Sequence, residues 1–352
     1  MKVRYIDLFC GVGGFRYAMQ GAALKNKIKA ECVLSSDIDP DCQRAYAENF
    51  GEKPTGDIHN IPPEQIPDHD ILLAGFPCQP FSIIGSRKGF EDARGTLFFE
   101  IARILEQKRP KMFVLENVKL LAGHNNGKTL ARIIEALREL GYFVDKKILN
   151  ALDFGLPQRR ERIFIVGFRL PANFSWPSEI KPMKPLRELL EKNVPKKFYA
   201  SKYIREKRIS KLKPTSEPTI WHENKSGHIS AYPYSCALRA GASYNYLLVN
   251  GERRLTPREM LRLQGFPDTF KIVCSDNQAR KQAGNSLPVP VAEAVINQAI
   301  KACSWENVSG YEANVKTRPS IERQMALFEK RKRYAKIAKT KNRRKIQAPV
   351  PA

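Results

Sequence analysis

The stretch Tyr5-Ile6-Asp7-Leu8-Phe9-Cys10-Gly11-Val12-Gly13-Gly14 decides which fold this chain is expected to adopt. Its apolar half, residues 5–9, predicts a buried strand. The glycines after it predict a tight turn into a helix, where the backbone can approach a ligand closely. Asp37 lies 24 positions beyond Gly13, near the spacing of about 20 residues at which a carboxylate holds a ribose hydroxyl in such folds. A tight turn that binds nothing would have the same pattern, so this motif alone does not identify a ligand.

Strand–helix alternation continues over the first 170 residues. Four further apolar runs predict buried strands, at residues 30–34, 70–74, 112–115 and 163–168. Apolar residues at helical spacing predict helices over 97–105 and 130–140, with Gly141 as the stop of the second helix. This alternation predicts an α/β fold with a mainly parallel sheet covered on both sides, in which ligands bind beyond the carboxyl ends of the strands.

Residues that can do chemistry follow four of the predicted strands, so we expect them to meet at one edge of the sheet. They are the glycine turn, Asp37, Cys78 and Glu116. The absence of a long phosphate-binding pattern favours S-adenosylmethionine over a nicotinamide dinucleotide as the ligand of the turn. Glu116 follows a buried apolar run. Burying a carboxylate there costs free energy unless it forms an ion pair or serves in binding or catalysis. A helix cap or a simple salt bridge is the alternative for Glu116.

Cys78 is a candidate nucleophile. It lies between Pro77 and Pro80 in Gly-Phe-Pro-Cys-Gln-Pro-Phe-Ser (75–82), a rigid polar turn in which a thiol with a lowered pKa or a nearby proton acceptor could attack. Most cysteines are small buried apolar residues, and the other six of the seven are scattered without a Cys-x-x-Cys pair. We therefore expect neither a disulfide scaffold nor a structural zinc site, and we expect a reducing compartment.

Arg160 and Arg162 precede the predicted strand 163–168 at alternate positions, so both should face the same side of it. Two guanidinium groups on one face suit a carboxylate, a phosphate or the carbonyl of a base. A charged strand end exposed to solvent is the alternative interpretation.

The composition indicates a folded protein with a polyanionic partner. The 352 residues predict about two domains, and a net charge of +24 points to nucleic acid or an anionic membrane. Residues 316–352 hold 13 Lys/Arg against two acids, and residues 181–214 hold 12 against three. The first of these segments reads as a basic tail, either a mobile arm or a solvated charge run. No apolar run is long enough for a transmembrane helix and the start does not resemble a signal peptide, so a soluble intracellular protein is expected.

Six blocks of the sequence together resemble the cytosine-5 DNA methyltransferases of bacterial type II restriction–modification systems. They occur in the order of that family and cover about residues 3–303. The blocks are Asp-Leu-Phe-Cys-Gly-Val-Gly-Gly-Phe (7–15), Gly-Phe-Pro-Cys-Gln-Pro-Phe-Ser (75–82), Glu-Asn-Val (116–118), Gln-Arg-Arg-Glu-Arg-Ile (158–163), Arg-Leu-Thr-Pro-Arg-Glu (254–259) with Gln-Gly-Phe-Pro (264–267), and Gly-Asn-Ser (284–286).

The resemblance implies transfer of a methyl group from S-adenosylmethionine to carbon 5 of a cytosine that is flipped out of double-stranded DNA. Cys78 would attack carbon 6 of the base. Glu116 would bond the ring nitrogen and the exocyclic amine, and Arg160 and Arg162 would hold the carbonyl. The cofactor-binding residues implied by the resemblance are Phe9, Gly11, Gly13, Asp37, Ile38, Asp57, Ile58, Pro77, Leu97 and Asn285. The chain departs from the family at Asp37, usually a glutamate, and at Ile38, often a bulky aromatic residue.

The resemblance also implies a domain organisation. Residues 1–170 plus 284–305 would form a discontinuous catalytic domain with a Rossmann-like methyltransferase sheet, because the helix after Gly284 would pack back on the first domain. Residues 171–283 would form a smaller, loop- and strand-rich target-recognition domain. Residues 85–95 look like the family's mobile loop, and residues 316–352 have no counterpart in its minimal members. The candidate DNA contacts are Ser82, Arg94, Arg239, Ser243 and Tyr244, with His222, Asn224 and Lys225 as further polar candidates.

The expected partner is double-stranded DNA, with no membrane and no metal, since His222 and His228 are too isolated for a metal site. We expect a monomer in the bacterial cytoplasm, associated with the nucleoid through DNA, that works alongside a restriction endonuclease without forming a stable complex. An RNA cytosine-5 methyltransferase is one alternative, but its tRNA-modifying branch carries a Cys-Phe-Thr tripeptide that this chain lacks. Two further alternatives are a catalytically silent DNA-binding regulator and a nicotinamide oxidoreductase. An oxidoreductase would leave the Pro-Cys-Gln-Pro sequence (77–80) unexplained.

Overall fold

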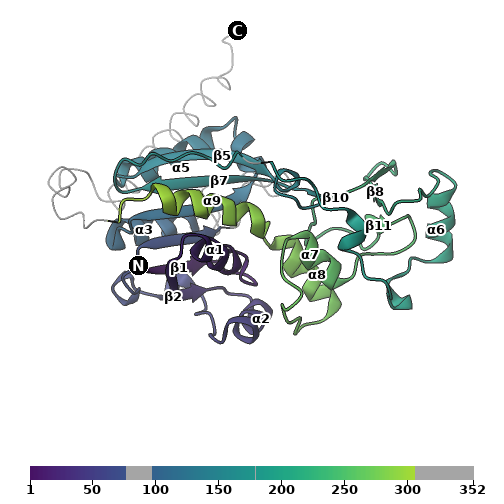
Figure 1. Ribbon diagram of the computed structural model, residues 1–352, viewed down its shortest axis with the longest axis horizontal. Coiled ribbons are helices and arrows are strands. Elements are labelled where there is room, and N and C mark those ends of the chain that lie inside the picture. Colours follow the sequence, from purple (N-terminus) through teal and green to yellow (C-terminus); the bar gives the residue numbers. More distant parts are fainter. Residues whose placement is uncertain (77–96, 179, 306–352) are drawn as a thin grey trace, which may run out of the picture. The chain divides into compact units, whose positions relative to one another are not determined.

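The computed structural model describes residues 1–76, 97–178 and 180–305. The main feature of this part is a six-stranded sheet with the strand order β2-β1-β3-β4-β7-β5 (Figure 1). Its strands are β1 (Lys2–Leu8), β2 (Lys29–Ser36), β3 (Ile71–Gly75), β4 (Met112–Val118), β5 (Phe143–Asn150) and β7 (Glu161–Phe168).

The sheet is mainly parallel, as predicted. Strands β2, β1, β3 and β4 pair in parallel, whereas β7 is antiparallel to both of its neighbours, β4 and β5. Each of the five predicted runs overlaps a strand, with Phe9 just after β1 and Asp70 just before β3, and the carboxyl ends of β1 to β4 meet at one edge. Sequence patterning missed β5, because this edge strand is largely exposed and carries Asp145, Lys146 and Lys147 instead of an apolar run.

Helices connect these strands. The first, α1, begins after Gly13 and buries Phe15, Ala18, Met19 and Ala22 along one face. Gly141, the predicted stop, has a positive φ and follows α5. The helices of this part are α1 (Gly14–Lys25), α2 (Pro40–Phe50), α3 (Leu97–Lys108), α4 (Leu120–Gly123), α5 (Lys128–Glu139) and α9 (Val289–Ala302). Short 3-10 helices lie at η1 (Ile58–Asn60), η2 (Pro63–Gln65), η6 (Ala151–Asp153), η7 (Leu186–Glu188) and η8 (Lys196–Phe198).

The last helix, α9, packs against the first, α1 (Figure 1). Lys25 forms an ion pair with Glu293 at 2.6 Å, and the Asn26 side chain donates to the Asn297 side chain at 2.8 Å. The chain segment after Gly284 thus packs against the first helix, and the discontinuous catalytic domain built from it stays a prediction. Residues 1–305 form one compact unit, so the domain boundaries at 170/171 and 283/284 remain predictions.

The segment between β7 and α9 forms smaller sheets. Strands β8 (Ile220–Glu223), β9 (Ile229–Tyr232) and β11 (Leu247–Val249) make an antiparallel sheet, and β10 (Ser235–Cys236) pairs with β6 (Gln158–Arg159). Three helices accompany them, α6 (Lys202–Ile209), α7 (Pro257–Leu263) and α8 (Asp276–Asn285). Figure 1 shows α7 and α8 between the large sheet and strands β8 and β11. In the part of the chain that the structure describes, every helix is too short or too polar to cross a lipid bilayer.

Candidate active site

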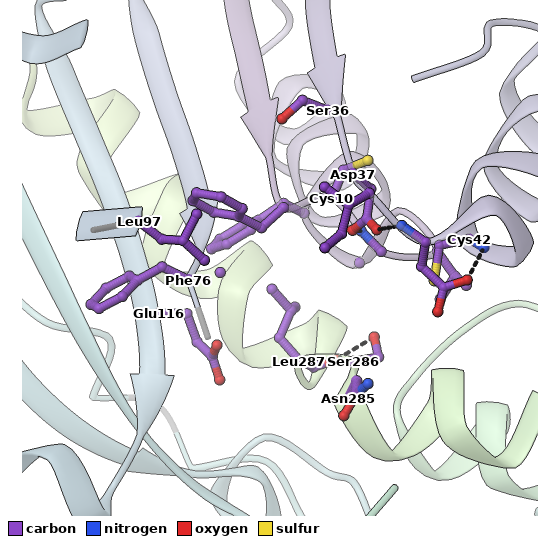
Figure 2. A pocket seen from close by; sticks show the side chains of 18 of the residues that line it. Cys10, Ser36, Asp37, Cys42, Phe76, Leu97, Glu116, Asn285, Ser286 and Leu287 are labelled. Carbon is purple, nitrogen blue, oxygen red and sulfur yellow. Dashed lines mark hydrogen bonds between the residues drawn. The ribbon is translucent and has the colours of Figure 1, made fainter. Parts of the chain in front are cut away.

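A cavity of about 940 Å³ opens where the ends of β1, β2, β3 and β4 meet the end of α8. This volume suits a cofactor or a drug-sized ligand. Figure 2 shows Phe76, Leu97 and Glu116 on one side of it, Asp37 and Cys42 on the other, and the 285–287 turn along a third wall. The predicted residues that line the cavity are Phe9, Gly11, Asp37, Ile38, Asp57, Ile58, Leu97, Glu116, Arg162 and Asn285.

The glycine turn uses backbone conformations that glycine adopts without strain. Gly11 has φ 53° and Gly13 has φ 85°. A Cβ atom on Gly13 would lie 2.2 Å from the Phe50 ring, so this glycine is required for packing between α1 and α2. Gly13 caps α1 and is not among the lining residues, whereas Gly11 lines the cavity. Of the two glycines, Gly11 therefore lines the cavity, whereas Gly13 lets α1 and α2 pack closely.

Asp37 is held by the backbone around it. Its carboxylate accepts from Gly11 N at 2.8 Å and from Asp39 N at 2.9 Å. Burial raises the pKa of Asp37, and these two hydrogen bonds oppose the shift. A carboxylate fixed in this way keeps free lone pairs that can accept from hydroxyl groups of a ligand. Ile38, the next residue, is 72% exposed on the cavity wall, which leaves an apolar surface for a planar ligand group.

Asp39 joins two walls of the cavity that are distant in sequence. It caps α2 by accepting from Asp41 N and Cys42 N. The same carboxylate accepts from Lys281 Nζ at 3.1 Å and from the Gln278 side chain at 3.2 Å, both on α8. Sequence reasoning missed Asp39, although an aspartate directly before a proline is a helix-start signal. Asp39 thus ties the start of α2 to α8, the helix whose last residue, Asn285, lines the cavity.

Glu116 and Arg162 form an ion pair at the end of β4. Glu116 Oε1 lies 2.8 Å from Arg162 Nε, both side chains are mostly buried, and both line the cavity. The antiparallel pairing of β4 with β7 sets Val118 opposite Arg162, which brings the two groups together. Burial raises the pKa of Glu116 although Arg162 and Arg160 oppose the shift. Burial thus makes protonation of Glu116 easier than for an exposed glutamate, while the ion pair with Arg162 favours its ionised form.

Arg160 requires a correction. The prediction gave it the same role as Arg162, holding the carbonyl of a base. Its side chain is completely buried and is not among the cavity-lining residues. The guanidinium group donates to the carbonyls of Leu238 at 2.8 Å, Gly284 at 2.9 Å and Ser286 at 2.5 Å. These three bonds, all from Nη1 and Nη2, hold the cavity-lining turn at 284–286 against the segment after β10, while Nε is buried without a partner among the described residues.

The charge of the cavity is uneven. Asp37, Asp39, Asp57 and Glu116 line it, whereas Arg162 is the sole Lys or Arg among the described lining residues and is paired with Glu116. Coulomb attraction in such a site favours a cationic ligand and disfavours a pyrophosphate. This observation fits the sulfonium of S-adenosylmethionine better than a nicotinamide dinucleotide. His59 also lines the cavity, and its Nδ1 lies 2.7 Å from Asp57 Oδ1. No sequence motif around His59 predicts that it belongs to this site.

Several predicted residues lie elsewhere. Cys78, Pro77, Ser82 and Arg94, together with the stretch 85–95 and the tail 316–352, fall outside the described residues. Among the predicted DNA contacts, Arg239, Ser243 and Tyr244 are exposed after β10, and Lys225 is exposed in the β8–β9 turn. Asn224 holds that turn by accepting from Ser226 N and His228 N. His222 is partly buried on β8, with its ring against Tyr246.

The sheet, the glycine turn and the anionic cavity define an α/β protein with a ligand site at the carboxyl ends of its parallel strands. Residues 3–301 match the family model described as C-5 cytosine-specific DNA methylase. The type II methyltransferase M.NgoBI of Neisseria gonorrhoeae is 57% identical over 294 residues, covering 82% of this chain and 90% of that protein. M.HaeII of Haemophilus aegyptius is 53% identical over 315 residues, covering 89% and 97%.

Solved structures agree on the fold. The Entamoeba histolytica methyltransferase EhMeth superposes with a TM-score of 0.67 at 19% identity, covering 86% of this chain and 98% of that one. A putative DNA modification methyltransferase encoded within a prophage of E. coli gives 0.66 at 20% identity, covering 85% and 99%. The chain belongs to the C-5 cytosine-specific DNA methylases. It is a DNA cytosine-5 methyltransferase that uses S-adenosylmethionine, as the resemblance implied.

Proposed function

We propose that this protein methylates its target cytosine through a covalent intermediate on Cys78, with Glu116 and Arg162 holding the flipped base. One observation carries the proposal. The Glu116–Arg162 pair and the Asp37 carboxylate line a single cavity at the ends of parallel strands. A base bound by the pair and a methyl donor bound by Asp37 would therefore share one cavity. A cytosine stacked in a duplex presents only its edges, so it must leave the stack to enter.

S-adenosylmethionine, when bound, supplies an electrophilic methyl group on a positively charged sulfur, which would keep the electron pair of the broken sulfur–methyl bond and become a neutral thioether. Asp37 would accept hydrogen bonds from the ribose hydroxyls, and Ile38 would contact the adenine ring. The carboxylates of Asp37, Asp39 and Asp57 would stabilise the positive charge. The remaining proposed contacts are Phe9, Gly11, Asp57, Ile58, Pro77, Leu97 and Asn285, with Gly13 supporting the turn from behind.

The base would be activated by residues of this chain. The Cys78 thiolate forms a bond to carbon 6 of cytosine, and the electron pair of the 5,6 double bond moves toward carbon 5 and the ring. A protonated Glu116 donates to the ring nitrogen and accepts from the exocyclic amine, which stabilises the charge that develops on attack. Arg162 donates to the base carbonyl. After carbon 5 has gained the methyl group, its proton leaves to water and the carbon–sulfur bond breaks, restoring the thiolate.

We further propose a biological setting from the type II relatives. Methylation at one DNA sequence would protect host DNA from a cognate restriction endonuclease, with which this protein forms no stable complex. It would act as a monomer in the bacterial cytoplasm, at the nucleoid. Residues 171–283 would recognise the target, with Arg239, Ser243 and Tyr244 among the DNA contacts and Ser82 and Arg94 as further candidates.

Expression in a methylation-free bacterial host tests the proposal, with 5-methylcytosine mapped in genomic DNA and in tRNA by bisulfite sequencing. We expect methylation at one cytosine of one recurring DNA sequence, and none with the Cys78→Ala variant. Unmodified DNA with modified tRNA would support the RNA alternative. Tight DNA binding with no modification of either would instead indicate a silent regulator.

A further inference from the structure

Three arginines and two tyrosines gather beside the cavity. Arg239, Tyr244 and Tyr246 lie between β10 and the end of β11, Arg254 precedes α7, and Arg280 is on α8. We name these five residues the arginine–tyrosine cluster. Three separate elements contribute to it, so only the folded chain brings its members together.

The rings support the guanidinium groups. Arg280 Cζ lies 4.4 Å and Arg254 Cζ lies 5.4 Å from the centroid of the Tyr244 ring, and Arg239 Cζ lies 5.0 Å from that of Tyr246. Tyr246 is buried and its hydroxyl accepts from Arg239 N at 3.0 Å, whereas Tyr244 is 50% exposed. Stacking on aromatic rings holds an arginine in place while its outer edge stays available for hydrogen bonds.

Among the described residues, no carboxylate neutralises the positive charge of the cluster. Within residues 1–76, 97–178 and 180–305, no carboxylate forms an ion pair with Arg239, Arg254 or Arg280. Arg280 donates to the Ala242 carbonyl at 2.8 Å and Arg254 to the Lys197 carbonyl, contacts that fix the side chains without cancelling their charge. Arg239 is exposed, and the other two are half-buried. A charged surface of this kind suits a polyanion.

The cluster lies at the rim of the cavity. Arg280 is on the helix whose last residue, Asn285, lines the cavity wall. A Cβ atom on Gly284 would lie 2.4 Å from Ala240 N, the neighbour of Arg239, so the two backbones are in direct contact there. A duplex that delivers a base into the cavity would therefore carry its sugar–phosphate backbone past these arginines.

We propose that the arginine–tyrosine cluster binds the backbone phosphates beside the flipped cytosine and positions the duplex without reading its sequence. This inference rests on the proposed function and deepens it. Phosphates are common to all sequences, so contacts to them set register and orientation and carry no base information. A planar guanidinium group can donate two parallel hydrogen bonds to one phosphate, which Lys and Gln cannot reproduce.

Equilibrium binding at 50 to 200 mM salt tests the assignment, using a duplex with the mapped target and an unrelated duplex of equal length. Each of Arg239→Gln, Arg254→Gln and Arg280→Gln should reduce the slope of log K against log salt by about 0.9. Both duplexes should be weakened by the same factor. Arg280→Lys should keep the slope because it keeps the charge. Lys147→Gln removes one charge from the exposed strand β5 and should change neither slope nor affinity.

Two results would overturn the assignment: slopes unchanged in all three glutamine variants, or a loss confined to the target duplex, which would mean base reading. Methyl transfer by the unaltered protein to the target duplex is measured in parallel. No transfer would overturn the proposed function, whereas normal transfer with unchanged slopes would overturn the role of the cluster alone.

Discussion

Glu116 Oε1 accepts from Arg162 Nε at 2.8 Å across the pairing of β4 with β7, on the wall of the cavity that also holds Asp37. Burial raises the pKa of this carboxyl group, and the guanidinium groups of Arg162 and Arg160 oppose that shift. We predict that Glu116→Gln lowers the single-turnover rate of methyl transfer by about a hundredfold or more, because an amide cannot transfer a proton to the base. Cofactor affinity, measured by calorimetry, should stay within a factor of two to three (about 0.6 kcal/mol) of the unaltered protein.

The matched control for this prediction is Glu161→Gln, which removes a carboxylate that pairs with Lys119 at the surface. It should leave the rate unchanged. Equal losses in both variants would mean that Glu116 acts through general electrostatics and not on the base.

The second prediction concerns Asp37 and the binding of S-adenosylmethionine. Asp37→Ala removes the carboxylate proposed to accept from the ribose, so S-adenosylmethionine should bind at least about tenfold more weakly. Asp37→Glu, the residue usual in the family, should retain most of the affinity. Asp68→Ala, an exposed carboxylate that pairs with Lys108, is the control. Unchanged binding in the Asp37→Ala variant would remove Asp37 from the cofactor site.

Substitution of Arg160 tests whether this residue has a structural or a catalytic role. Arg160→Lys cannot satisfy all three buried carbonyls, and each carbonyl left unpaired costs about 1–3 kcal/mol. We predict that urea unfolding shows a loss of stability of about 2–4 kcal/mol. A variant that unfolds like the unaltered protein but has lost turnover would restore the catalytic interpretation of Arg160.

Asp7 gives a prediction for pH. This carboxyl group on β1 is completely buried, and burial raises its pKa to about 8. The unfolded chain ionises Asp7 near pH 4 whereas the folded chain keeps it protonated, so unfolding releases a proton between these values. The contribution of Asp7 to stability is thus complete at low pH and is lost as the pH rises toward 8. Relative to Asp7→Asn, the unaltered protein should lose about 1.4 kcal/mol per pH unit between pH 5 and 8 in urea unfolding. Parallel profiles for the two proteins would contradict this assignment.

The sequence predicted those parts of the fold that depend on local patterns. Buried strands are apolar runs, and the residues at their carboxyl ends converge for geometric reasons, so the sequence could predict that Asp37 and Glu116 lie at one edge of the sheet, where both line the cavity. Strand β5 was missed because an exposed edge strand needs no apolar run. The burial of Arg160 depends on carbonyls at 238, 284 and 286 that are distant in sequence. No local pattern encodes such contacts.

The covalent step is tested most directly with a duplex that carries 5-fluorocytosine at the mapped target position. Fluorine cannot leave carbon 5 as a proton does, so the bond from Cys78 to carbon 6 should persist after methyl transfer. We predict a protein–DNA adduct that survives denaturing electrophoresis, with the attachment site at Cys78 by mass spectrometry, and no adduct with Cys78→Ala. An adduct that forms at another cysteine, or turnover of ordinary DNA with no adduct on the fluorinated duplex, would contradict the mechanism.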